Sequence, residues 1–207
     1  MSDGPLLWYL NRATGIVLLL LMTLTVVLGT LVRRHGRLPG LPRFAVAGLH
    51  RNVGLLSALL LVAHVVTAVV DSYVDIGVTD VLVPFRSGYL PVAIGLGTVA
   101  LDLTVLIVVT SLLRDRLPRR LWKPVHLTSY LLWPVAFLHG LTAGTDLRSG
   151  WVLALVLTCA VATTGASAAA LAARRAAPPP PERAPAAVTA TFTALAAGTP
   201  VAVYRNG

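Results

Sequence analysis

The sequence has few charged residues and a single cysteine. Charged side chains make up 12% of the 207 residues, hydrophobic residues make up 56%, and the mean hydropathy is +0.79. An ordinary soluble domain has about 25% charged residues, so the composition excludes that class and favours an integral membrane protein. Cys159 has no second cysteine in the chain to pair with. Its position inside an apolar segment indicates a packing role.

Acidic residues are also scarce, with 8 against 17 basic residues and a net charge of +9. Such a charge is typical of nucleic-acid-binding proteins, but here the basic residues lie beside long apolar segments, so we expect no nucleic-acid partner. Each segment is long enough to cross about 30 Å of hydrocarbon at about 1.5 Å per residue. The segments run over approximately residues 15–32, 52–70, 87–113, 124–145 and 151–173.

The distribution of charge between the loops predicts an orientation. The first and third loops, with the residues that flank them, are strongly basic: Arg33, Arg34, Arg37, Arg43, Arg51, Arg114, Arg116, Arg119, Arg120 and Lys123. The second and fourth loops are weakly charged: Asp71, Asp75, Asp80, Arg86, Asp146 and Arg148. The positive-inside rule places the basic loops in the cytoplasm. We therefore expect an all-α bundle of about five transmembrane helices in the plasma membrane, with the N-terminus outside and the C-terminus inside.

The two ends of the chain complete this organisation. No basic region precedes the first apolar segment and no small-residue cleavage site follows it, so we expect this helix to be retained. A proline run at residues 178–181 is a stiff spacer before a stretch rich in alanine, threonine and valine. We expect a transmembrane domain over residues 1–175 and a Pro/Ala-rich, disordered cytoplasmic tail over residues 176–207.

Four of the five histidines occur in two matched pairs along the apolar segments. His50 and His64 are fourteen residues apart, and His126 and His139 are thirteen apart. Fourteen residues of helix rise about 21 Å and return to within about 40° of the starting direction, so His50 and His64 share a face. The segments at 52–70 and 124–145 are predicted to run in the same direction. His126 then lies at the depth of His50 and His139 at the depth of His64, which permits two cross-helix pairs.

The thirteen-residue spacing needs a distortion, because a regular helix would turn His139 about 140° away from His126. Pro134 lies between these two histidines and removes one backbone hydrogen bond. We therefore expect a kink or local rewinding around residues 131–134.

Ionisable groups are costly in hydrocarbon and are usually kept there for a function, so the four histidines need a shared explanation. A single zinc or di-iron centre needs ligands within a few ångströms, whereas the two predicted pairs are about 20 Å apart. Two axial imidazoles on haem iron leave no open coordination site, an arrangement that suits electron transfer. The pattern favours a membrane cytochrome with two haems.

The spacing of these histidines resembles that of the ferric reductase-like transmembrane domain, the haem-carrying core shared by ferric reductases and NADPH oxidases. The resemblance extends over about residues 7–173, with His50-Arg-Asn-Val-Gly through His64 and His126-Leu-Thr-Ser-Tyr through His139-Gly as its motifs. It implies that His50 and His126 ligate an inner haem b, and His64 and His139 an outer haem b. The domain over residues 1–175 is accordingly expected to bind haem iron.

No glycine-rich dinucleotide fingerprint follows the last apolar segment, and the 34 residues after Ala173 are too few for a flavin or NAD(P)H domain. The chain is similar in this respect to the haem partner of bacterial methionine sulfoxide reductase systems. This resemblance implies flavin only through a partner protein: a cytoplasmic flavoprotein donor that docks on the basic loops, and an extracytoplasmic acceptor. We expect the electron-transfer subunit of an oxidoreductase, without catalytic residues of its own.

Five further residues are candidates for supporting roles. Arg12 either pairs with outer-haem propionates, as the resemblance to oxidases implies, or extends to the headgroups. Arg51 and Lys123 are the corresponding candidates at the inner haem. Trp133 lies seven residues after His126 and is placed either between the haems or in ordinary packing. For Asp102, the only acid deep within a span, we expect a structural hydrogen bond.

Two other functions remain open from the sequence. The histidines and Asp102 could relay protons in an ion or solute transporter, although five helices without an evident inverted repeat make this weaker. Alternatively, a haem-free scaffold subunit would use the histidines only to bond neighbouring helices. Gly54 and Gly140, each near a histidine, either give a porphyrin edge room or let helices approach closely.

Overall fold

The computed structural model describes residues 6–33, 42–72, 74–144, 149–176 and 196. Its regular structure in this part of the chain is entirely helical, which confirms the expected fold class. The helices are α1 (Leu6–Arg33), α2 (Arg43–Val70), α3 (Val78–Leu82), α4 (Pro91–Leu112), α5 (Arg119–Leu127), α6 (Ser129–Ala143) and α7 (Gly150–Arg175). Most of the first loop, including His35, lies outside the described residues, as do Asp146 and Arg148 of the fourth loop and nearly all of the tail.

Within the described residues, four helices are long and apolar enough to cross a membrane: α1, α2, α4 and α7. They correspond to four of the five expected segments, and they make the chain a multi-pass membrane protein. The remaining segment is divided into α5, with 9 residues, and α6, with 15 residues. Each is shorter than the roughly 20 residues that a spanning helix needs, so this segment could cross only as a broken pair.

The break in this segment does not lie where Pro134 predicted it. Helix α6 continues through Pro134, and the interruption is at Thr128. The Thr128 N–H donates to the Val125 carbonyl at 3.0 Å, and the Thr128 hydroxyl donates to the same carbonyl at 2.7 Å. A threonine hydroxyl competes in this way for a helix carbonyl, and the three-residue bond tightens the last turn of α5. The break changes the phase of α6 relative to α5, which the thirteen-residue spacing requires.

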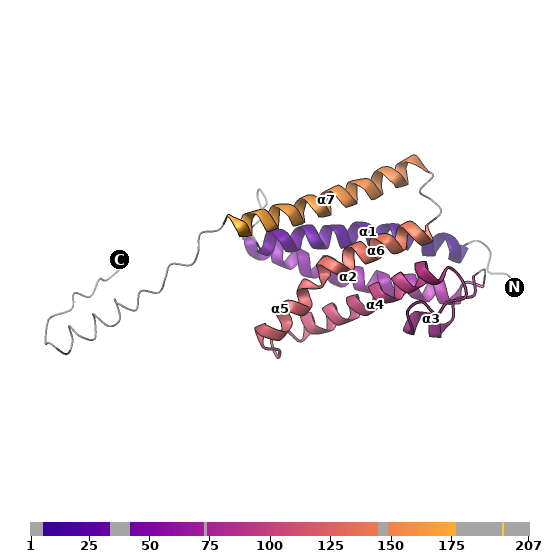
Figure 1. Cartoon of the computed structure of the whole chain (residues 1–207), viewed down its shortest axis with the longest axis horizontal. Coiled ribbons are helices and arrows are strands. Elements are labelled where there is room, and N and C mark those ends of the chain that lie inside the picture. Colours follow the sequence, from indigo (N-terminus) through magenta and orange to yellow (C-terminus); the bar gives the residue numbers. More distant parts are fainter. Residues whose placement is uncertain (1–5, 34–41, 73, 145–148, 177–195, 197–207) are drawn as a thin grey trace. The chain divides into compact units, whose positions relative to one another are not determined.

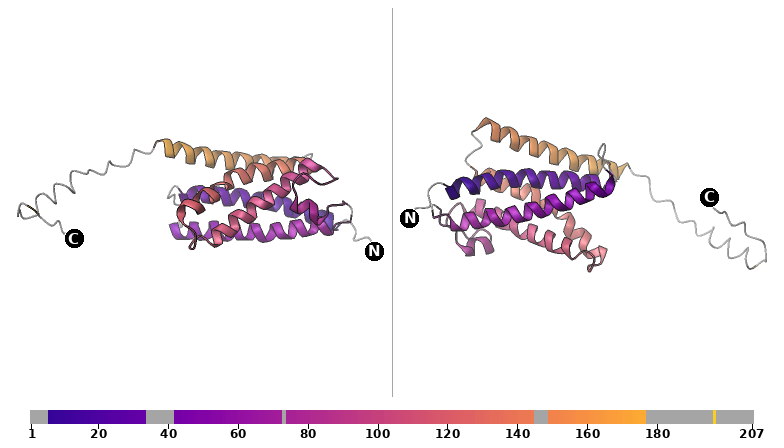
Figure 2. Two further views of the ribbon diagram at one scale, coloured as in Figure 1. Left: turned by 60° about the horizontal axis from the view of Figure 1, so that its bottom comes forward. Right: turned by 180° about the vertical axis from the view of Figure 1, so that it is seen from behind.

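Two helix contacts dominate the bundle (Figure 1): α1 packs along α2, and α4 packs along α6. Smaller contacts join α6 to α1 and α4 to α2. Leu28, Val46 and Val53 form a buried cluster between α1 and α2. Figure 2 shows the α1–α2 and α4–α6 pairs from two further sides.

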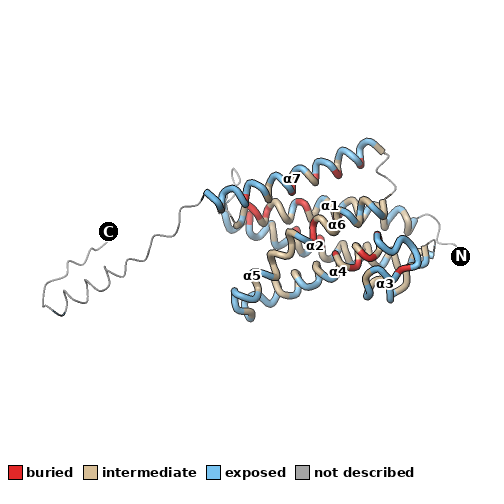
Figure 3. Tube along the Cα trace, viewed as in Figure 1, coloured by how far each residue is buried: buried red, intermediate tan, exposed pale blue. Residues whose placement is uncertain are grey.

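The outward surface of the helices is largely apolar and exposed. Buried positions form short stretches on the inner faces (Figure 3), while large side chains such as Phe44, Leu59 and Val161 are 69–79% exposed. In a bilayer these side chains face lipid tails that are as apolar as they are. The distribution therefore fits the membrane assignment.

The connection from α2 to α4 is held tightly against the start of α4. Phe85 and Leu90 have positive φ angles of 64° and 42°. A Cβ at Gly95 would collide with the Phe85 ring and backbone, so only glycine allows the close approach. The Thr98 hydroxyl donates to the Asp80 carbonyl at 2.8 Å. We call the end of the bundle formed by residues 71–90 the loop end, and the opposite end, which carries α5, the basic end.

Candidate functional site: two facing histidine pairs

The structure brings the four histidines together in the two expected pairs. The ring centres of His50 and His126 are 6.1 Å apart with an interplanar angle of 79°, and those of His64 and His139 are 6.4 Å apart at 82°. A metal bound at about 2 Å from one nitrogen of each of two facing imidazoles would place the ring centres about 6 Å apart. Both pairs therefore have the separation that a shared metal ion needs.

Three of the four rings are oriented by a backbone carbonyl. The Nδ1 atoms of His50, His64 and His139 lie 2.9, 3.0 and 2.8 Å from the carbonyl oxygens of Thr25, Asn11 and Ala93. Because a carbonyl only accepts, each Nδ1 carries the proton and donates it. Among the described residues no hydrogen-bond partner faces an Nε2 atom of the four histidines. The lone pair of Nε2 is then available to a metal, as in most metal-bound histidines whose other nitrogen donates outward.

The same three rings lie against glycines. A Cβ added at Gly15 would stand 3.3 Å from Cε1 of His64, one at Gly29 would stand 3.1 Å from Cε1 of His50, and one at Gly97 would stand 2.8 Å from Cε1 of His139. Each glycine lies four residues after the carbonyl that accepts from the same ring. One turn of helix thus supplies both the acceptor and the space.

His126 is held differently. Its Nδ1 lies 3.2 Å from the Ser111 hydroxyl, and the Trp122 indole stacks on its ring with centres 5.0 Å apart and an interplanar angle of 22°. Ser111 follows Gly97 by fourteen residues on α4, just as Gly29 follows Gly15 on α1. These spacings equal that of His50 and His64. Sequence reasoning missed Gly15, Gly29, Gly97 and Ser111, although the repeated spacing was a signal for them.

A cavity of about 300 Å³ surrounds the His64–His139 pair. Helices α1, α2, α4, α6 and α7 and the loop end all contribute to its lining. Arg12 lines this cavity, and its guanidinium lies 4.6 Å from the centre of the Trp8 ring, in a cation–π contact. The structure therefore places Arg12 beside the pair that the sequence assigned to it.

Trp133 is buried at the level between the two pairs. Its indole N–H donates to the Thr23 hydroxyl at 3.0 Å, and Thr23 lies on α1 between Gly15 and Gly29. The Trp133 ring stacks on Phe137, with ring centres 5.0 Å apart, and Phe137 lines the cavity. The hydrogen bond to Thr23 fixes the orientation of the indole.

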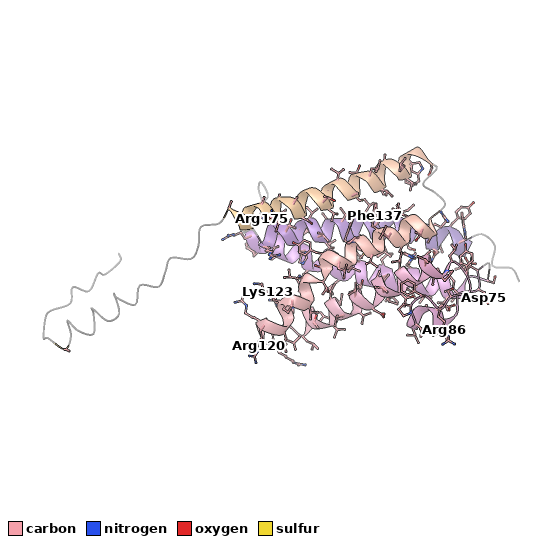
Figure 4. All side chains as sticks on the ribbon, viewed as in Figure 1. Asp75, Arg86, Arg120, Lys123, Phe137 and Arg175 are labelled. Carbon is pink, nitrogen blue, oxygen red and sulfur yellow. The ribbon has the colours of Figure 1, made fainter. Side chains whose placement is uncertain are left out.

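The other candidates are exposed or border open space. Arg51 and Lys123 are exposed. Figure 4 shows Lys123 with Arg120 at the basic end, opposite Asp75 and Arg86. A Cβ at Gly140 would meet no atom within 4 Å, although Gly140 lines the cavity, and one at Gly54 would make only an ordinary contact with Thr25.

Asp102 corrects a sequence expectation. Its side chain is exposed on α4, and within the described part of the chain it makes no hydrogen bond or ion pair. The expected structural hydrogen bond is therefore not found there. Since the histidine rings turn into the bundle and Asp102 turns outward, the carboxylate is not aligned with them as a proton relay would require.

The residues present fit haem iron held by two axial imidazoles. The facing rings supply two imidazole ligands per site, and a cavity lies at the His64–His139 pair. In the described residues, no group of three or more histidine, cysteine or carboxylate side chains could hold a metal ion by itself. A pair of ligands is what an iron already held by four porphyrin nitrogens requires.

Comparison with known proteins identifies one family. Residues 14–137 match the profile of the family described as "Ferric reductase like transmembrane component". The match contains His50, His64 and His126 and ends two residues before His139. No curated protein sequence and no solved structure matches the chain.

Proposed function

Because the chain belongs to the ferric reductase-like transmembrane family, we propose that it is a membrane di-haem b cytochrome. It passes electrons from a cytoplasmic flavin- or NAD(P)H-dependent donor to an extracytoplasmic acceptor. The observation that carries this proposal is the presence of two pairs of facing imidazole rings, with ring centres 6.1 and 6.4 Å apart. In these rings Nδ1 has a hydrogen-bond partner and Nε2 has none among the described residues. The family supports the general part of the proposal, because its membrane domains are electron-transfer components.

In this proposal His50 and His126 ligate the inner haem, and His64 and His139 ligate the outer haem. Haem b held in this way supplies a one-electron carrier on each side of the membrane. The chain's own contribution is orientation, because the carbonyls of Thr25, Asn11 and Ala93 fix the proton on Nδ1 and make Nε2 a stronger ligand.

The basic end is assigned to the cytoplasm by the positive-inside rule. Arg119, Arg120 and Lys123 are exposed on α5 and form a surface for an acidic flavoprotein donor. Arg51 is a further cation of this end. In this orientation the N-terminus is outside, residues 176–207 are a cytoplasmic tail, and the membrane is the plasma membrane.

The loop end then faces the acceptor. Arg12 borders the cavity around His64 and His139 and is placed to neutralise a carboxylate there. Trp133, between the two levels, holds an aromatic ring in the gap between the pairs. The outward position of Asp102 counts against the transporter alternative, and a haem-free scaffold would have no use for four free Nε2 atoms.

Proteoliposomes test the proposal. Vesicles that contain the haem-loaded protein and trapped ferricyanide are given dithionite outside, and ferricyanide reduction is followed by absorbance. We expect reduction to be much faster than in empty vesicles and to be lost in H64A and H139A. G165A should behave as wild type, because a Cβ at Gly165 on α7 would meet no atom within 4 Å and Gly165 does not line the cavity. A purified protein without a Soret band, or ferricyanide reduction no faster than in empty vesicles, would overturn the proposal.

A further inference from the structure

Two buried hydrogen-bond donors at the basic end have no partner among the described residues. They are Nη2 of Arg33, at the end of α1, and the indole Nε1 of Trp122, on α5. Burying a donor without an acceptor is unfavourable, and burying part of a guanidinium without a counter-ion is more so. Both groups therefore indicate a ligand that brings acceptors.

Arg33 points toward the His50–His126 pair by helix register. It follows Gly29, which touches the His50 ring, by one turn of α1. It follows Thr30, which is 3% exposed, by three residues. Since residues three and four apart share a helix face, Arg33 lies on the inward face, one turn closer to the basic end than the histidine.

Trp122 approaches the same pair from α5. Its indole lies against the His126 ring with an interplanar angle of 22°, so the indole N–H lies beside a ligand of the proposed inner haem. Trp122 thus contacts one member of the pair, His126, and Arg33 lies one helix turn beyond Gly29, which approaches the other member, His50.

The chain offers no carboxylate to these donors in its described part. Asp71, Asp75 and Asp80 belong to the loop end, and Asp102 is exposed on α4. Asp115 is exposed and its carboxylate lies 3.4 Å from Nε of Arg114. A carboxylate of a bound molecule would match both a guanidinium and an indole N–H.

We propose that Arg33 and Trp122 bind the propionate carboxylates of the inner haem. The inference rests on the proposed function and gives the inner haem a defined orientation, with its propionates toward the basic end. It assigns this role to two buried donors in preference to the exposed Arg51 and Lys123. A buried cation beside a propionate also favours the reduced iron, because it offsets the negative charge that stabilises the oxidised state.

Redox titration of the two haems tests this assignment. In R33Q the equilibrium constant for reduction of the inner haem should fall about tenfold, which corresponds to a reduction potential about 59 mV lower for a one-electron couple. The potential of the outer haem should not change. W122F keeps an aromatic ring on His126 but removes the N–H, and should give a smaller shift of the inner haem in the same direction. R33K should largely restore the wild-type value. R51Q and K123Q are the matched controls and should titrate as wild type.

The haem held by His64 and His139 serves as an internal check of folding in each variant. Wild-type potentials in both R33Q and W122F, or equal shifts in R51Q or K123Q, would overturn the assignment while leaving the di-haem proposal intact. A wild-type protein that binds no haem would overturn both.

Reconstitution of the apoprotein gives a second readout. Haem b should bind the inner site more tightly than its dimethyl ester, which lacks free carboxylates. This preference should shrink at least about fivefold in R33Q and W122F. An unchanged preference would show that these residues do not contact the propionates.

Discussion

Around His64 and His139, both Nδ1 atoms are held by backbone carbonyls and both rings lie against glycines, whereas around His126 a serine hydroxyl and a tryptophan replace these features. The His64–His139 pair also lines a cavity to which five helices and the loop end contribute. His126 instead lies on α5, a short helix with exposed cations next to a break.

The difference has a consequence for each pair. The Thr14 hydroxyl also lies 3.2 Å from Nδ1 of His64, but the His64 and His139 rings each keep a backbone carbonyl acceptor that no side-chain substitution removes. The orientation of the His126 ring depends on the side chains of Ser111 and Trp122. A single substitution at either residue can therefore change it.

Gly97→Ala should have the largest effect, because its Cβ would stand 2.8 Å from Cε1 of His139 and force the ring to move. We expect haem affinity at the His64–His139 site to fall by about 10–100-fold, as for a lost ligand-orienting contact. Gly29→Ala and Gly15→Ala, at 3.1 and 3.3 Å from their rings, should have smaller effects in that order. Haem content after purification measures the series. Equal loss in Gly165→Ala, where an added Cβ would meet no atom within 4 Å, would contradict the steric explanation.

Ser111→Ala removes the hydroxyl that orients His126 and tests whether this pair depends on side chains. Haem affinity at the His50–His126 site should fall by about tenfold, with the other site unaffected. Ser111→Thr, which keeps a hydroxyl, is the matched control. The comparison between the pairs would fail if Ser111→Ala left both sites at wild-type affinity in a haem titration.

Trp133→Phe tests the region between the pairs. The change leaves the buried Thr23 hydroxyl without its donor and removes part of a ring that is 7% exposed. We expect a loss of about 1–3 kcal/mol in the free energy of unfolding, measured in detergent, with both haems retained. Thr23→Val in the Trp133→Phe background should restore part of this loss, because both polar partners are then absent. If the losses in the free energy of unfolding for Trp133→Phe and Thr23→Val simply added in the double variant, the hydrogen bond would not couple the two residues.

The sequence predicted much of this arrangement and missed the details that depend on packing. Hydropathy was sufficient for the helical membrane fold, and helix rise was sufficient for the pairing of His50 with His126 and His64 with His139. The sequence predicted the break near Pro134 rather than at Thr128. A proline always removes a backbone hydrogen bond, whereas the effect of a threonine hydroxyl on a helix cannot be predicted until its acceptor is known. Gly15, Gly29 and Gly97 are unremarkable in apolar helices until a ring is seen against each of them.

Asp102→Asn should have the smallest effect. Because the carboxylate is exposed and outside the pairs, haem content and both potentials should stay at wild-type values. The substitution also separates electron transfer from proton transport. A proteoliposome that acidified or alkalinised its interior in an Asp102-dependent way would favour the transporter interpretation.

The pairing itself is tested most directly by haem content in single and double histidine variants. Two haems per protein are expected in the wild type, and one in each of H50A, H126A, H64A and H139A. H50A/H126A should still bind one haem, since both changes destroy the same site, whereas H50A/H64A should bind none. Retention of one haem in H50A/H64A, or loss of both in H50A/H126A, would contradict two independent bis-histidine sites.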